Sequence, residues 1–242
     1  MTSAPRIDLG DDRLDHALGA LGSDLPVPPP LGDELEQSLA ELAPITPRRP
    51  KRQYTVVAAL SLLYAGFLLL MTDLRPDLSG LPNTWLIVYA AVWLVSFLGI
   101  TWLVLVPGPD KVMPNWRYAG IGAAIAIVGF VLGGMLFPHD PGQPADAPLF
   151  GKVVFAHGCL VWGTITALVP IALASLLLRG SVPVGSRWVG AGIGAAGGSL
   201  GGLFLHLHCP VADAFHLGVI HGGVVLVSAV LGAVVLPQAR RA

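Results

Sequence analysis

The chain has 242 residues, of which 54% are hydrophobic and 12% are charged, and this charged share is about half that of an ordinary soluble domain. So few charges cannot cover the surface of a water-soluble globule, and the mean hydropathy of +0.70 agrees. The composition excludes a soluble α/β enzyme, a nucleic-acid-binding domain with a basic face and a disulfide-rich secreted module, since two cysteines allow at most one internal bridge.

The first 47 residues form an acidic segment with nine acids and two arginines. Two leucine-containing stretches in it have helical spacing, and proline-rich sequence separates them. The leucines on the two apolar stripes are Leu14, Leu18, Leu21, Leu25, Leu31, Leu35, Leu39 and Leu42. Because short isolated helices are marginal in water, we expect residues 1–53 to form a partly disordered cytoplasmic tail that folds on a basic protein partner. The alternative is a disordered tail whose leucines are incidental.

Six apolar stretches follow a basic cluster at residues 48–52. They cover residues 54–71, 84–106, 118–137, 153–178, 188–206 and 216–236, and none contains Asp, Glu, Lys or Arg. Each is about as long as the ~20 residues that cross a bilayer, and only helices satisfy their own backbone hydrogen bonds there at this length. The sequence therefore predicts an all-α fold: a six-span transmembrane helical bundle over residues 54–236, followed by a cytoplasmic end at 237–242.

Positive charge predicts how the bundle is oriented. If the N-terminus is cytoplasmic, 12 of the Lys and Arg residues lie in inner segments, and only Arg75 and Lys152 lie in outer loops. Such an excess predicts that both termini lie in the cytoplasm. The basic cluster would then meet the anionic inner leaflet of the lipid bilayer.

Small residues recur in two of the stretches. Glycines at every fourth position in the fifth stretch (190–202), with Gly129 and Gly133 in the third, predict close helix packing within the bundle, and a homodimer contact is left open. The same stretches share the sequence Ala-Gly-Ile-Gly-Ala-Ala, and His157-Gly aligns with His221-Gly in the stretches that follow. This indicates either a duplicated helical hairpin or a chance similarity between Gly-rich helices.

Six of the seven histidines and both cysteines fall in the outer half of this topology. Imidazole and thiolate bind soft or borderline metals, and two thiols on an oxidising face can form a bridge. Three interpretations stay open: a redox-sensing pair of Cys159 and Cys209, a metal site, or polar contacts between helices. The metal site would draw on His206, His208 and Cys209, with His221 or His157, and zinc or copper at the outer face would suit these donors.

Helical spacing restricts this metal site. His157 and Cys159 are two residues apart, so on a helix they cannot both ligate one ion. His206 and Cys209 can share a face, and His208 can join them only if the helix has ended, which Pro210 favours. His157 and His221 are a candidate haem pair. We find no acid/base constellation of an enzyme, and the absence of charges within the stretches disfavours an ion-coupled permease.

Two short motifs carry a family resemblance. They are Leu42-Ala-Pro-Ile-Thr-Pro-Arg-Arg49 before the first stretch and Leu207-His208-Cys209-Pro210 between the last two. In these motifs and in its layout the chain resembles the polytopic bacterial anti-sigma factors of the NrsF type. The resemblance implies a protein of the bacterial inner membrane whose tail holds an extracytoplasmic-function sigma factor inactive and whose bundle releases it on an envelope signal. The additional histidines depart from the family pattern and leave open whether that signal is metal, oxidant or another; we expect a redox or metal signal from the cysteines and histidines. The alternative is a metal- or haem-binding membrane protein without a regulatory partner.

Overall fold

The computed structural model describes residues 49–107, 116–137, 149–178 and 186–239. These residues form six long helices, a 3-10 turn and a π-helical turn. In chain order they are α3 (Pro50–Thr72), η1 (Leu78–Gly80), α4 (Asn83–Leu105), α5 (Trp116–Leu136), α6 (Leu149–Leu177), α7 (Ser186–His208), η2 (His216–His221) and α8 (Gly222–Ala239). Six segments are long and apolar enough to cross a membrane, the sixth being η2 together with α8. The predictions of an all-α fold and of six spans are confirmed.

Two helices extend beyond the predicted limits of the bundle, residues 54 and 236. Helix α3 begins at Pro50, within the predicted tail, and α8 continues to Ala239, past the predicted end of the bundle. Proline suits the first turn of a helix, because the N–H that it lacks has no partner there in any case. The eight stripe leucines lie outside the described residues, as do residues 240–242.

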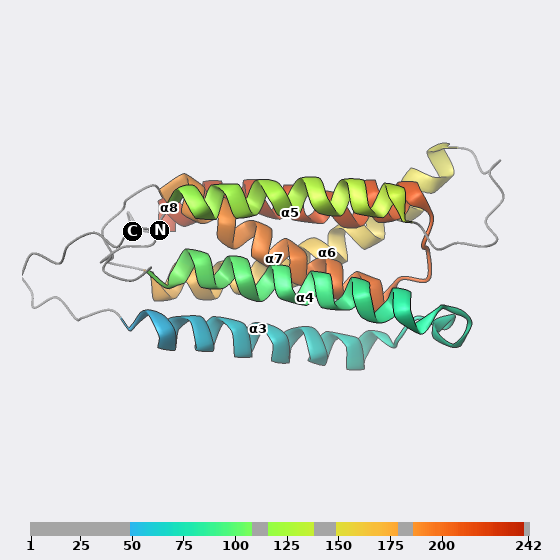
Figure 1. Cartoon of the computed structure of the whole chain (residues 1–242), viewed down its shortest axis with the longest axis horizontal. Coiled ribbons are helices and arrows are strands. Elements are labelled where there is room, and N and C mark those ends of the chain that lie inside the picture. Colours follow the sequence, from blue (N-terminus) through green and yellow to red (C-terminus); the bar gives the residue numbers. More distant parts are fainter. Residues whose placement is uncertain (1–48, 108–115, 138–148, 179–185, 240–242) are drawn as a thin grey trace, which may run out of the picture. The chain divides into compact units, whose positions relative to one another are not determined.

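Helix α7 lies at the centre of the bundle. In the part of α7 that would span the membrane, 83% of the residues are buried inside the bundle. The corresponding share in the other five spans is 22–50%. Figure 1 shows α7 crossing obliquely between α5 and α4. It is also the least hydropathic of the six windows, which fits a helix that packs on protein rather than on lipid.

The glycines of α7 explain how closely its neighbours approach. A Cβ added at Gly198 would lie 2.5 Å from Val225 Cα on α8. One added at Gly194 would meet the backbone at Ser228, and one at Gly202 would meet the ring of Trp93 on α4. Small residues let helix backbones touch where lipid removes the hydrophobic drive, so α7 packs as its glycine spacing predicts.

Gly129 and Gly133 on α5 do not follow this prediction. A Cβ added at either glycine would meet nothing within 4 Å. The rings of Trp93 on α4 and Phe130 on α5 stack with centroids 3.5 Å apart, and this stack lies between the two helices. The glycines therefore line an open seam between α4 and α5 instead of a packed contact.

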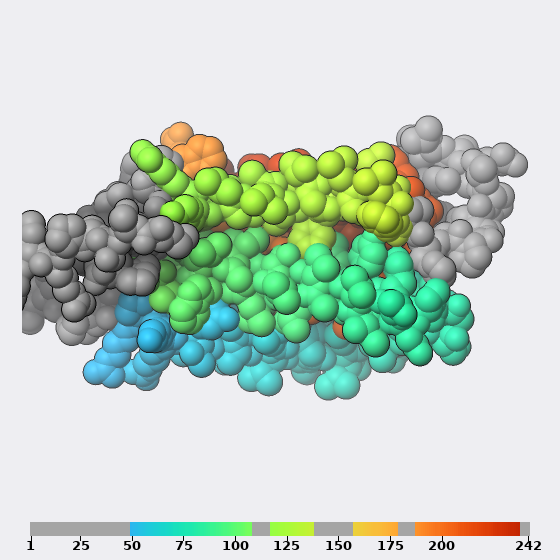
Figure 2. Space-filling model, viewed as in Figure 1, coloured from blue at the N-terminus to red at the C-terminus, as the bar shows by residue number. Residues whose placement is uncertain are grey.

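Helix α3 buries little of its surface against the other helices. Only 22% of its spanning window is buried, and large apolar side chains such as Leu63 and Leu70 are exposed. Figure 2 shows α3 along one edge of the face that α4 and α5 share. Near the start of α3, Gln53 Nε2 donates to Leu177 O of α6 at 3.0 Å.

Candidate functional site

Helix ends from across the chain meet at one end of the bundle, where α3, α5 and α7 finish and α4, α6 and η2 begin. Arg75 N–H donates to Leu207 O at 3.0 Å, and Trp85 Nε1 donates to Phe137 O at 3.3 Å. Both cysteines lie at this end, which we call the cysteine end.

The two cysteine thiols are in direct contact. Cys159 Sγ on α6 lies 3.4 Å from Cys209 Sγ, and both are free thiols. Cys209 directly follows α7, and its N–H donates to Leu205 O at 2.7 Å, so the backbone turns once more before Pro210, which has no N–H to continue the helix. Cys209 is buried and Cys159 is half-buried.

A histidine completes a three-residue cluster with the thiols. His216 Nε2 lies 3.3 Å from Cys209 Sγ, and one donor atom from each of Cys159, Cys209 and His216 lies within 4.8 Å of the others, a grouping that could hold a metal ion. Asp213 fixes this turn, because its Oδ1 accepts from His216 N–H at 3.0 Å. We call these three residues the thiol–imidazole cluster.

His221 lies beside the cluster. Its ring meets that of His216 edge to face, with centroids 5.0 Å apart. The side chain is 1% exposed, and neither ring nitrogen has a hydrogen-bond partner among the described residues. Histidines five residues apart would point about 140° away from each other on an α-helix, but η2 is a π-helix, whose i→i+5 register brings such residues together.

The surroundings of Cys209 favour its neutral thiol. The contact with the Cys159 thiol raises the pKa of Cys209, burial raises it further, and the neighbouring His216 and His221 oppose both. A neutral thiol has an S–H to donate, and either the Cys159 sulfur or His216 Nε2 can accept it.

The other predicted metal ligands lie elsewhere. His206 is buried, and its Nε2 is 3.1 Å from Leu86 O. Its ring stacks on that of Tyr89 and lies tilted against that of Trp85, both on α4. His208 Nδ1 is 2.9 Å from Asp73 O.

His157 is exposed, whereas His221, its counterpart in the sequence repeat, is buried. Of the predicted site residues the structure thus brings together Cys209 and Cys159, with His221 nearby. His216 was absent from the predicted set.

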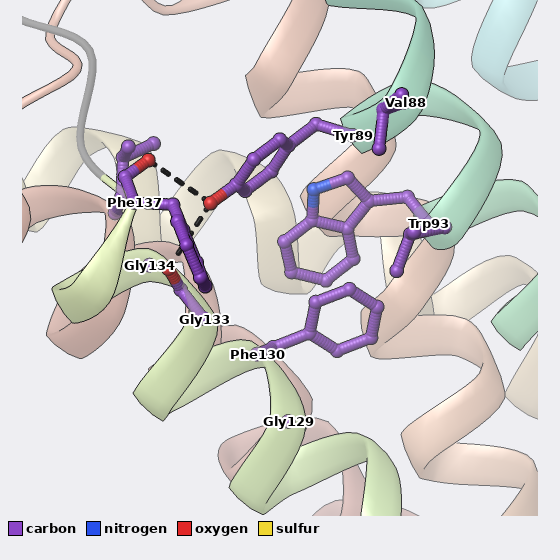
Figure 3. A pocket seen from close by; sticks show the side chains of 10 residues that line it. Val88, Tyr89, Trp93, Gly129, Phe130, Gly133, Gly134 and Phe137 are labelled. Atoms are coloured by element: carbon purple, nitrogen blue, oxygen red, sulfur yellow. Dashed lines mark hydrogen bonds between the residues drawn. The ribbon is translucent and has the colours of Figure 1, made fainter. Parts of the chain in front are cut away.

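The seam between α4 and α5 contains a separate apolar pocket of about 220 Å³ (Figure 3). The Tyr89 hydroxyl closes one side by donating to Gly133 O and Phe137 O, each at 3.0 Å. The Trp93–Phe130 stack forms another wall. The lining contains no carboxylate, imidazole or thiol, so the thiol–imidazole cluster is the better candidate for chemistry.

Comparison with known proteins assigns the chain to a family. Residues 39–241 match the family model NrsF, described as negative regulator of sigma F. No curated protein and no solved structure matched the chain. The matched range contains all six helices and the thiol–imidazole cluster, and it includes Leu39 and Leu42 of the tail. The chain therefore belongs to the NrsF family of negative regulators of sigma F.

Proposed function

We propose that this multi-pass membrane protein sequesters an extracytoplasmic-function sigma factor through its N-terminal tail and releases it when the cysteine end receives a redox or metal signal. The observation that carries the proposal is the contact of Cys159 and Cys209, at 3.4 Å and with His216 alongside, in a chain whose family regulates a sigma factor. Two thiols in contact across two elements can change the distance between those elements when they react.

A redox signal would act by joining the two sulfurs. A two-electron oxidant such as a quinone takes two electrons and two protons from the Cys159 and Cys209 thiols, and an S–S bond forms between them. A disulfide is about 2.05 Å long, so the sulfurs must move closer than the 3.4 Å that now separates them. The α7–η2 connection would then be fixed to α6.

A metal signal would act at the same atoms. Thiolate and imidazole are the ligands that zinc and copper prefer, and Cys159, Cys209 and His216 offer both types within 4.8 Å. Binding would displace the thiol protons, so the affinity should increase with pH. Neighbouring His221 has ring nitrogens without partners in the described part of the chain, and it is the candidate fourth ligand.

The tail would hold the sigma factor at the membrane. Its nine acids against two arginines suit a basic surface such as that of a nucleic-acid-binding protein. The two leucine stripes would enter apolar grooves as the tail folds. The excess of Lys and Arg in the segments on the tail's side of the membrane supports an inner-membrane protein with both termini in the cytoplasm.

Co-purification of the full chain with a co-expressed extracytoplasmic-function sigma factor tests the tail, a sigma factor gene beside this one being the first choice. We expect Leu18→Asp and Leu35→Asp to abolish retention of the sigma factor, because each places a charge on a stripe. Leu9→Asp, off the stripes but in the same tail, is the matched control. Equal retention by all three variants and the parent would contradict the proposed role of the stripes.

Exposure of the same complex to the oxidant diamide, or to zinc or copper, tests the signal. The parent should release the sigma factor, whereas Cys159→Ser and Cys209→Ser should retain it under the stimulus that acts through these thiols. Release from both variants would exclude the cysteines from the mechanism. A stoichiometric haem absorption band or bound copper, with no sigma factor retained, would favour a cofactor-binding protein instead.

A further inference from the structure

Arg75, in the α3–α4 connection, is buried at the cysteine end. Its side chain is 0% exposed, and it pairs with Asp77 through two bonds, from Nε at 2.7 Å and from Nη2 at 2.8 Å. Such a bidentate arrangement fixes the plane of the guanidinium group. The same connection thus holds both charges of the pair.

The remaining donors of Arg75 reach the end of α7. Nη1 donates to His206 O at 3.3 Å and Nη2 to Pro210 O at 3.0 Å, while the Arg75 N–H donates to Leu207 O. The last carbonyls of a helix have no partners within it and carry partial negative charge, so a cation is their natural partner. All three acceptors lie within residues 206–210, the segment that contains Cys209.

Asp73 shows that the connection is held in place by these contacts. It is the one described non-glycine residue with a positive φ, at φ 63° and ψ 157°, a backbone conformation that essentially only glycine adopts freely. Its carbonyl lies 2.9 Å from His208 Nδ1. Such a conformation persists only where the surroundings enforce it, and here those surroundings are again the end of α7.

Helix α3 connects this region to the tail. Residues 73–77, which we call the strap, follow α3 directly. The basic cluster spans the start of α3, and the rest of the tail precedes it in the sequence. Helix α3 is the least buried of the six spans, so neighbouring helices restrain it little along its length. A displacement of the strap can therefore displace α3.

We propose that Arg75 is a positioning residue that couples the state of Cys209 to helix α3 through the carbonyls of residues 206–210. The inference rests on the proposed function, since it takes the cysteine pair as the receiver of the signal. When Cys209 moves toward Cys159, the carbonyls on both sides of it move relative to Arg75. The strap then loses its hydrogen bonds to these carbonyls, and the Asp73 backbone leaves its positive-φ conformation. The end of α3 that joins the strap is then no longer held against the end of α7.

Hydrogen–deuterium exchange on the full chain in lipid nanodiscs tests this coupling without a sigma factor. In the reduced parent, the Arg75 amide is protected by Leu207 O and the Gly80 amide by Asp77 O. We expect diamide, which takes two electrons and two protons from the thiols, to accelerate exchange in peptides over residues 73–82 by roughly 5- to 150-fold, the range of a typical allosteric coupling.

Variants separate Arg75 from the cysteines. In Arg75→Gln we expect exchange over residues 73–82 to be fast already in the reduced protein and unchanged by diamide, while thiol alkylation shows that the disulfide forms as in the parent. Asp77→Asn keeps the arginine, loosens its bidentate pair and should give an intermediate result. Arg187→Gln, at an exposed arginine in the first turn of α7 at the opposite end, should behave as the parent.

The outcomes distinguish this inference from the proposed function. Unchanged exchange in the oxidised parent, or a normal response in Arg75→Gln, would overturn the coupling through Arg75, even if the sigma factor is still released on oxidation. Faster exchange over the strap, with no sigma factor retained by the parent in either state, would leave the coupling standing and refute the proposed function.

Discussion

Substitution of Gly198 by alanine should separate α7 from α8. The added Cβ would lie 2.5 Å from Val225 Cα, 3.0 Å from Val224 O and 3.1 Å from Val225 N. All three are backbone atoms, so no side-chain rotamer change can relieve the contact. Ordinary van der Waals contact begins at 3.4 Å, and the two helices must therefore move apart by roughly 1 Å.

We expect Gly198→Ala to lower the free energy of unfolding by about 1–3 kcal/mol, the usual cost of an overpacked core. The gain in helix propensity from glycine to alanine, about 1 kcal/mol in water, offsets part of the steric cost. Reversible unfolding in mixed micelles, titrated with dodecyl sulfate and followed by circular dichroism, measures the difference.

Gly129→Ala is the matched control for this prediction. It makes the same chemical change in the middle of another spanning helix, where the new Cβ meets nothing within 4 Å. Its free energy of unfolding should equal that of the parent or exceed it by up to about 1 kcal/mol. If Gly198→Ala proved no more destabilising than Gly129→Ala, the close backbone contact of α7 with α8 would be refuted.

Three further predictions concern the cysteine end. Asp73→Gly should raise the free energy of unfolding by about 1 kcal/mol in the same titration, since glycine adopts the positive φ without strain; a loss of stability would contradict the strain. Arg75 lowers the pKa of Asp77 from 3.8, so the pair stabilises the fold fully above pH 3.8 and its contribution is lost as pH falls through the lowered value. Asp77→Asn should thus destabilise at neutral pH and match the parent in strong acid, and a pH-independent difference would refute the ion pair. Because Cys159 is the largest cause of the raised pKa of Cys209, Cys159→Ala should shift the pH midpoint of Cys209 alkylation downward; an unshifted midpoint would show that burial dominates.

The sequence predicts the six helices because a bilayer restricts an uncharged spanning segment to very few conformations. Backbone polar groups in hydrocarbon must pair within their own helix, so long uncharged stretches become helices whatever surrounds them. The glycine spacing of α7 also indicates close packing, but the same spacing at Gly129 and Gly133 does not lead to it, because the neighbouring Trp93–Phe130 stack lies between α4 and α5. Whether a glycine-lined helix face packs against the backbone of another helix therefore depends on the side chains between the two helices.

The site is harder to predict because it depends on irregular backbone. His216 was missed since regular α-helical spacing directs it away from His221, and only the π-helical turn brings the two rings together. His206 and His208 face the carbonyls of Leu86 and Asp73 instead of Cys209. Those acceptors belong to other helices and connections. A local sequence pattern does not show which of these elements pack against α7. The cysteine pair could be proposed because both thiols were expected at the same end of the bundle.

Arg75 is buried, whereas the side chain of its partner Asp77 is 40% exposed, and the pair lies in a connection that the topology from positive charge places outside. The positive-inside count treats Arg75 as one of two cations in outer loops, and its pairing with Asp77 leaves the count unchanged, because acidic residues contribute little to it. Orientation in turn decides which signal is chemically accessible. A cytoplasmic cysteine end would be kept reduced by the cellular thiol pool, and the disulfide would not persist there, whereas a metal could still bind. Labelling intact cells at Lys152 with a membrane-impermeant amine reagent, against Lys152→Arg, therefore tests the redox signal as well as the topology: a lysine that reacts only after lysis would leave metal as the signal to pursue.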